Sequence, residues 1–168
     1  PEKLWRFANR MFFTLLVDLT GITLLGIFFS PQLVKILAYG FRVSPDKRDL
    51  TIQLNRLMFP YIFFISLAAL ASGILNSMGS FALPAFTPVL LNLAIIVAAV
   101  FFSRNFSNPA FAFAWGVLVG GLLQFLVQVP SLIRRGMTFH PEVSFSDPGI
   151  RQVGRLMLPR IFGAGITQ

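Results

Sequence analysis

Residues 76–92 read NSMGSFALPAFTPVLLN and join two hydrophobic segments that carry no charge. Pro84, Pro88 and Asn92 lie at or inside the start of the second segment. Prolines and amides are costly in hydrocarbon unless they face protein or a water-filled cavity. The stretch therefore favours a membrane protein with a functional interior, such as a transporter, over a plain membrane anchor.

Long hydrophobic runs dominate the rest of the chain. Hydrophobic residues make up 55% of the 168 residues, and charged residues only 12%. A helix needs about 20 residues to cross a bilayer, and four runs are long enough: 11–29, 57–75, 85–102 and 110–129. The sequence therefore predicts an all-α, polytopic transmembrane helix bundle.

A fifth hydrophobic run begins at Leu156 and reaches the last residue, Gln168. We expect four complete spans plus the start of a fifth. Because the chain opens with Pro1, we also expect it to be an excerpt of a longer protein.

The polar segments between the runs hold most of the charge. Residues 30–53 and 132–155 are expected at the membrane interface, where lipid headgroups are better counterions than nucleic acid for the formal charge of +8. Ser44-Pro45-Asp46 is typical of a helix start, and Asp147-Pro148 repeats the pattern. The distribution of Lys and Arg slightly favours a cytoplasmic N-terminal end.

Asp18 is the only charged side chain in the four long runs. A carboxylate near mid-bilayer costs several kcal/mol, so a role in a proton, ion or substrate path is one interpretation. The alternative is a protonated or hydrogen-bonded aspartate that locks two helices together, through Asn92 or through a residue in the missing part of the protein.

Small residues recur every three to four positions in two runs. The second run carries a stripe of such residues: Ser66, Ala69, Gly73 and Ser77. In the fourth run, Gly116 and Gly120 suit a tight helix crossing. We therefore predict helix packing at Gly73, Gly116 and Gly120.

Two glutamines follow in the fourth run at the same spacing. Gln124 and Gln128 could line a cavity or form hydrogen bonds across helices.

The prolines allow two interpretations. Pro88 leaves the carbonyl of Pro84 without its usual helical donor. This pattern is typical of a hinge or gate in an alternating-access transporter, but also of a static kink that shapes the bundle. Pro159, with Gly163 nearby, predicts similar pliability in the last run.

Enzymatic chemistry has little support in the sequence. His140 is the only histidine and lies in a polar loop, where a solvated side chain is the ordinary expectation. No phosphate-binding Gly-rich loop and no cysteine occur. We therefore expect neither a metal nor any other cofactor, and no catalytic site.

Three blocks carry a resemblance to a known family. RLMFPYIFFISLAALASGILNSMGSFALPAFTPVLLN (56–92) resembles the MurJ/MviN lipid II flippases of bacteria, and the segments 115–132 and 154–168 fit in the same order and spacing. The resemblance implies membership of the multidrug/oligosaccharidyl-lipid/polysaccharide exporter superfamily. The complete protein would have 14 helices, of which this chain supplies the third to the sixth and the start of the seventh.

The resemblance implies transport of the undecaprenyl-pyrophosphate-linked peptidoglycan precursor across the bacterial inner membrane, with membrane lipids as further partners. It places residues 1–10, 79–83 and 132–155 in the cytoplasm. The family's substrate-binding arginines lie mostly on helices absent from this chain, so they cannot be assigned here. Thr167 and Gln168 are the best substrate-facing candidates. The other residues that match the family are Asn76, Ser77, Pro84, Pro88, Asn92, Gly120, Gly121, Gln124, Pro159 and Gly163.

Two rival interpretations stay open at this point. One is a sister exporter of the same superfamily that carries another lipid-linked sugar or a drug. The other is a non-transporting membrane scaffold, which predicts that Asp18, Pro88 and Asn92 tolerate apolar replacement.

Overall fold

The computed structural model describes residues 2–37, 45–143, 148–149, 152 and 155, and this part of the chain is helical without any strand. The all-α prediction is therefore confirmed. The elements are α1 (Glu2–Phe28), α2 (Ser30–Leu37), α3 (Pro45–Ser77), α4 (Ala82–Val97), the π-helical segment η2 (Ala98–Phe102), the short 3₁₀ helix η3 (Ser103–Asn105), α5 (Ala110–Leu126) and α6 (Val129–Arg134).

Within the described residues, four helical stretches are long and apolar enough to cross a membrane, which indicates a multi-pass membrane protein. They are Lys3–Phe28, Pro45–Ser77, Ala82–Asn105 and Ala110–Arg134. Each stretch is longer than the corresponding hydrophobic run, because the helix continues into flanking residues; the first stretch ends at Phe28, one residue before the end of the run 11–29. The expected fifth span, from residue 156 onward, lies outside the described residues.

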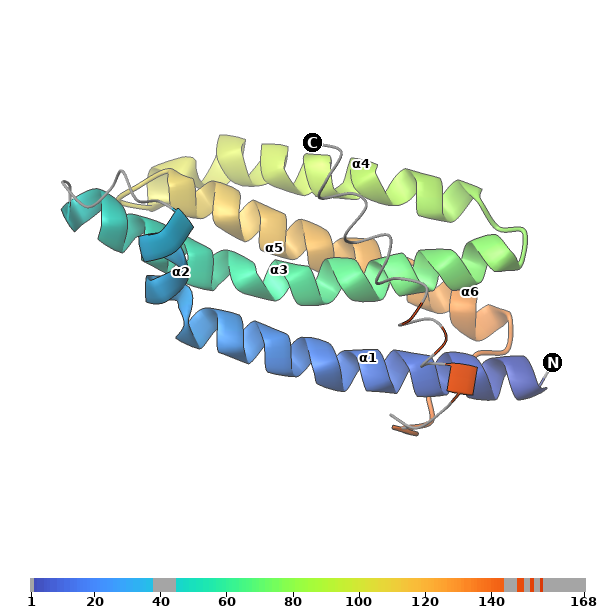
Figure 1. The fold of residues 1–168 in the computed structure, drawn as a ribbon. Coiled ribbons are helices and arrows are strands. Elements are labelled where there is room, and N and C mark those ends of the chain that lie inside the picture. Colours follow the sequence, from blue (N-terminus) through green and yellow to red (C-terminus); the bar gives the residue numbers. More distant parts are fainter. Residues whose placement is uncertain (1, 38–44, 144–147, 150–151, 153–154, 156–168) are drawn as a thin grey trace, which may run out of the picture.

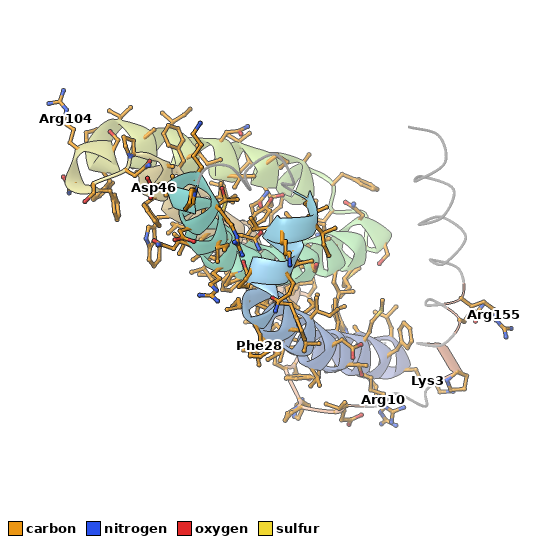
Figure 2. The ribbon with its side chains drawn as sticks, turned by 60° about the vertical axis from the view of Figure 1, so that its left-hand side comes forward. Lys3, Arg10, Phe28, Asp46, Arg104 and Arg155 are labelled. Carbon is orange, nitrogen blue, oxygen red and sulfur yellow. The ribbon has the colours of Figure 1, made fainter. Side chains whose placement is uncertain are left out.

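The long helices lie side by side in the order α1, α3, α5, α4 (Figure 1). α3 packs against both α1 and α5, and α4 packs against α5. The start of α1, the α3–α4 turn and α6 lie together at what we call the N-terminal end of the bundle. Lys3 and Arg10 mark this end in Figure 2, while Asp46 and Arg104 mark the opposite one.

The core lies toward the N-terminal end, between α1, α3 and the chain that follows α5. Phe12 of α1 stacks on Phe125 of α5 with ring centroids 6.0 Å apart, and it meets the edge of Phe139 at 5.3 Å. Leu132 and Met137, from α6 and the segment after it, are buried in the same cluster. The chain after α6 is thus part of the core.

Two glycines end helices at this end of the bundle. Gly79 has a φ of 75°, and its N–H donates to the Asn76 carbonyl at 3.0 Å, while the Ser80 N–H donates to the Leu75 carbonyl at 2.9 Å. This is the Schellman arrangement, in which a left-handed residue lets the chain satisfy the last carbonyls of a helix. It reverses the chain from α3 into α4.

Gly136 repeats the arrangement after α6. Its φ is 102°, its N–H donates to Ile133, and the Met137 N–H donates to Leu132 at 3.1 Å. The two turns are linked, because the Arg135 guanidinium donates to the Met78 carbonyl at 3.3 Å.

The predicted helix starts fall partly outside the described residues. Pro45 is the first residue of α3 and Asp46 lies in its first turn, as the pattern indicated, but Ser44 is not described. Pro60 lies within α3, which runs through it as one helix. Asp147 is likewise outside the described residues.

Candidate functional site

Asp18 lies on the exposed side of α1. Thr14, one turn earlier, is buried, whereas Asp18 forms no hydrogen bond or ion pair within the part of the chain that the structure describes. The proposed lock through Asn92 is absent, because Asn92 is also exposed and its helix, α4, lies at the other side of the bundle (Figure 1). An unsatisfied carboxylate on a membrane-spanning helix has to face protein or water.

Asn76 and Ser77 belong to the end of α3 and are both exposed. The Asn76 carbonyl accepts the N–H of Gly79, and the Ser77 hydroxyl donates to the Ile74 carbonyl at 2.7 Å. In the described residues these groups therefore shape the α3–α4 turn.

The proline pair of α4 has a partner that the sequence analysis did not identify. The carbonyl of Pro84, which Pro88 deprives of its helical donor, accepts the hydroxyl of Thr87 at 2.9 Å. Thr87 is buried with an exposed fraction of 6%. Since the freed acceptor is satisfied within the same turn, α4 continues through Pro88 without leaving this carbonyl unpaired.

Gln128 forms a polar bridge between α5 and α3. Its side chain is fully buried and accepts the Ser72 hydroxyl at 2.9 Å. Its amide donates to the Ala68 carbonyl at 3.2 Å and to the Gln124 carbonyl at 2.9 Å. Of the two roles open for this glutamine, the structure shows bonding across helices.

The Gln128 side chain also supplies a hydrogen bond at the junction between α5 and α6, where the helical pattern of backbone hydrogen bonds is interrupted. Pro130 stands in the first turn of α6, and just before it the Gln128 N–H donates to Phe125. The side-chain amide of Gln128 then supplies a donor to the Gln124 carbonyl. The side chain of Gln124 is buried too, but its Oε1 has no partner in the described structure.

Three glycines of α5 face two different helices. A methyl group at Gly116 would lie 2.9 Å from the Ile95 Cα, and one at Gly120 would lie 3.0 Å from the Leu91 Cα, so both face the backbone of α4. A methyl group at Gly121 would lie 2.6 Å from the ring of Tyr61 in α3. These glycines let α5 sit close to both neighbours.

Helix packing was also expected at Gly73, but within the described residues no helix packs against it. It is exposed, and a Cβ added there would have no neighbour within 4 Å. Ala69 and Ser77 of the same stripe are exposed as well. The face of α3 that packs is the adjacent one: Leu67, Ala68, Ala71 and Leu75. Both faces of α3 are apolar, so small-residue spacing alone does not identify the one that α1 and α5 cover.

The cavities formed by the described residues include the following two. One, of about 440 Å³, lies between α4, η2 and α5 and has an apolar lining that includes Leu93, Trp115 and Val119. The other, of about 360 Å³, lies at the N-terminal end between α1 and residues 136–142. We call the second the interfacial cavity.

The remaining candidates have the following outcome. Pro159, Gly163, Thr167 and Gln168 lie outside the described residues. His140 is exposed and lines the interfacial cavity. Among the described residues there is no group of His, Cys, Asp and Glu that could hold a metal ion.

Sequence reasoning missed several polar contacts. Thr87 was detectable, because a hydroxyl directly before a helical proline is near the carbonyl that the proline frees. The bond from Asn55 to the Ser30 hydroxyl at 2.8 Å, which links α3 to α2, left no local signal. The ion pair of Arg10 with Glu142, at 2.9 Å, spans 132 residues and could not be found from spacing.

Comparison with known proteins gives one consistent result. The family model described as lipid II flippase MurJ matches residues 1–168. A probable lipid II flippase MurJ of Buchnera aphidicola subsp. Acyrthosiphon pisum is 43% identical over 147 residues, which is 88% of this chain and 29% of the relative. The lipid II flippase MurJ of Burkholderia cenocepacia is 42% identical over 154 residues, 89% of this chain and 30% of the relative.

A third relative covers almost the whole chain. The probable lipid II flippase MurJ of Haemophilus influenzae is 34% identical over 174 residues, which is 99% of this chain and 34% of the relative. The chain thus spans about a third of the length of the relatives it matches.

Proposed function

The chain belongs to the family of the lipid II flippase MurJ, and we therefore propose that the complete protein translocates lipid II across the bacterial inner membrane. The family match over all 168 residues is the observation that carries this proposal. The cargo would be the undecaprenyl-pyrophosphate-linked precursor of peptidoglycan. Transport by alternating access would serve cell-wall biosynthesis without a catalytic step.

We place residues 1–168 in the N-terminal bundle of a 14-helix transporter, as part of its wall. Moving lipid II requires a polar, cation-lined cleft that hides the anionic headgroup from hydrocarbon. The four long hydrophobic runs contain one charged side chain, the anionic Asp18. Their buried glutamine Gln128 is occupied by bonds between helices. This composition supports a scaffold role, with the binding cations elsewhere in the protein.

Asp18 and Asn92 are our candidates for contact with the transport path. Both are polar, exposed side chains on membrane-spanning helices. Contact with hydrocarbon would cost several kcal/mol for the Asp18 carboxylate and less for the Asn92 amide. We propose that each faces protein or water in the complete transporter.

The α4 prolines are better explained as a static element. The hydrogen bond from Thr87 to Pro84 satisfies the carbonyl that Pro88 frees, so α4 continues through Pro88 with that carbonyl paired in the described conformation. We propose that Pro84 and Pro88 set the direction of α4, and that the turn at Asn76 and Ser77 fixes its starting point.

Complementation tests the function directly. The full-length gene is expressed in a bacterium depleted of its own lipid II flippase, and survival and surface labelling of lipid II are scored. We expect survival together with labelled lipid II at the cell surface. If the protein is expressed and inserted but neither is restored, the proposal is wrong and a sister exporter for another lipid-linked sugar takes its place.

A further inference from the structure

The interfacial cavity is formed by two segments that are more than 120 residues apart. One turn of α1 contributes Trp5, Arg6 and Asn9, and the segment after α6 contributes Thr138, His140 and Glu142. Its volume of about 360 Å³ far exceeds the roughly 10–15 Å³ that a single water requires on a comparable measure. The space accommodates a polar group many times larger than water.

The segment after α6 is shaped so that it presents polar side chains to this cavity. Residues 137–143 have no helical structure, and the His140 N–H donates to the Thr138 carbonyl at 2.9 Å, which turns the chain at Phe139. Met137 and Phe139 pack in the core. The residues between and after them, Thr138, His140 and Glu142, line the cavity.

The position of this segment is fixed at both ends. Gly136 has a φ of 102°, and a Cβ there would lie 3.2 Å from the indole nitrogen of Trp5. At the other end, Glu142 Oε2 accepts a hydrogen bond from Arg10 Nε at 2.9 Å. The wall of the cavity is therefore held against α1 by a turn, two core side chains and an ion pair.

The base of the cavity contains a buried acceptor without a donor. Asn9 has an exposed fraction of only 5%, and its Oδ1 has no hydrogen-bond partner in the described structure. A buried amide oxygen left unpaired destabilises the structure. Asn9 lines the cavity, but its Oδ1 has almost no accessible surface in this conformation, so a rotation of the side chain brings it to the N–H or O–H donors of a ligand.

The charges around the cavity call for a ligand with both signs. Glu142 engages Arg10 through Oε2, which leaves Oε1 able to accept another donor. Arg6 is exposed at the rim and supplies donors and positive charge, and His140 adds a ring N–H. An ammonium group suits the acceptors Asn9 and Glu142, while a phosphate suits Arg6.

The membrane supplies such a group at this depth. The first membrane-spanning stretch begins at Lys3, so Trp5 and Arg6 lie in its first turn. Tryptophan is typical of the headgroup region, and Lys and Arg are attracted to lipid phosphates there. We propose that the interfacial cavity binds the headgroup of an aminophospholipid, phosphatidylethanolamine, with its ammonium at Asn9 and Glu142 and its phosphate at Arg6.

The test uses the complete protein in detergent, freed of its own lipid. It is mixed with equal amounts of phosphatidylethanolamine and phosphatidylcholine of identical acyl chains, and the bound lipid is counted by native mass spectrometry. Phosphatidylcholine has the same phosphate but no N–H donor. We expect about tenfold more phosphatidylethanolamine to be retained, as one or two hydrogen bonds to the acceptors predict. Equal retention would overturn the proposal and leave a cavity filled by water.

Variants locate the bound lipid. Asn9→Leu removes the buried acceptor, and the protein should then retain the two lipids in about equal amounts. Glu142→Gln, at an exposed position, should reduce the preference for phosphatidylethanolamine several-fold. The matched control is Asn105→Leu, an exposed asparagine at the opposite end of the bundle, which should keep the full preference. An undiminished preference in both Asn9→Leu and Glu142→Gln would place the lipid elsewhere and refute the assignment.

Two further additions define the ligand. Excess soluble phosphoethanolamine should not displace the lipid, because it lacks the acyl chains that bind to the apolar surface of the protein; displacement would assign the site to a soluble phosphate ester instead. Phosphatidylglycerol, with hydroxyl donors but no ammonium, should bind less well, and equal binding would contradict recognition of the amine. Transport of lipid II is not needed for any of these readouts, so their failure leaves the proposed function untouched.

Discussion

Thr87 shows how one hydroxyl determines whether a proline is tolerated inside a membrane helix. Its bond of 2.9 Å to the Pro84 carbonyl replaces the N–H that Pro88 lacks. We expect Thr87→Val to lower the free energy of unfolding of the complete protein by about 1–3 kcal/mol, the cost of a buried acceptor left unpaired. The measurement is a titration with a denaturing detergent.

The control for this prediction is Thr51→Val. The Thr51 hydroxyl donates to the Lys47 carbonyl, four residues earlier, at 2.7 Å, whereas Thr87 donates to the carbonyl three residues earlier. No proline follows one turn after Lys47, so that carbonyl keeps its helical donor. We expect a change of less than about 0.5 kcal/mol there. In a Pro88→Ala background, which restores the N–H, Thr87→Val should lose most of its cost. If Thr87→Val lowers the free energy of unfolding equally with and without Pro88→Ala, the Thr87 hydroxyl does not replace the donor that Pro88 lacks.

Gln128 is expected to matter for folding rather than for transport. Gln128→Leu removes the contacts to Ser72, Ala68 and Gln124 and should destabilise the protein by about 2–4 kcal/mol. Ser72→Ala should cost less, and the two changes together should cost less than their sum, because they share one bond. A variant that is fully stable yet inactive in complementation would contradict this and place Gln128 in the path.

Individual residues were predictable from the sequence only where the signal was local. The missing donor at Pro84 follows from Pro88 four positions later. The contact between Gln128 and Ser72 depends on how α3 and α5 are placed relative to each other, which no spacing within one helix specifies. This is why both roles for the glutamines stayed open until the structure was known.

The close approach of α5 to α4 depends on two glycines. At Gly116 and Gly120 an added methyl group meets backbone atoms about 3 Å away, and backbone cannot move aside as a side chain can. We expect Gly116→Ala and Gly120→Ala each to cost about 1–3 kcal/mol in unfolding free energy. Denaturing-detergent titration of the complete protein checks both.

Gly73→Ala provides the comparison, since no described atom lies within 4 Å of its added Cβ. It should cost less than either change in α5. If it costs as much, another segment of the complete protein packs on that face of α3, and the interpretation of that face as uncovered is wrong.

Element boundaries and faces differed in how well the sequence specified them. Hydrophobic length predicted the helical fold, because about 20 apolar residues have to satisfy their own backbone in lipid. The packed face of α3 was not predictable, because Leu67 and Ala71 on one side look no different in hydrophobicity from Ile62 and Ala69 on the other. In water the exposed face would be polar; in a membrane protein that contrast disappears.

The exposed surface of the whole molecule is largely apolar, which makes the few polar side chains on it informative. Large hydrophobic residues such as Leu24, Leu93 and Phe101 are exposed on three different elements. On α1, Asp18 interrupts this surface at mid-helix. Lipid is a suitable environment for the exposed hydrophobic residues and an unsuitable one for the Asp18 carboxylate. We therefore expect the complete protein to present protein or water to the side of α1 that carries Asp18.

Cysteine labelling of the complete protein tests whether the side of α1 that carries Asp18 faces protein or water. This chain contains no cysteine, so Asp18→Cys and Leu24→Cys each add a single thiol to it. Leu24 lies on the same helix with an exposed fraction of 62%, on another face, and should contact lipid. We expect a water-soluble maleimide to label the cysteine at position 18 at least about tenfold faster than the one at position 24, because thiols react as thiolates and hydrocarbon suppresses ionisation. Equal, slow labelling at both positions, together with full complementation by Asp18→Leu, would show that Asp18 faces neither water nor the transport path.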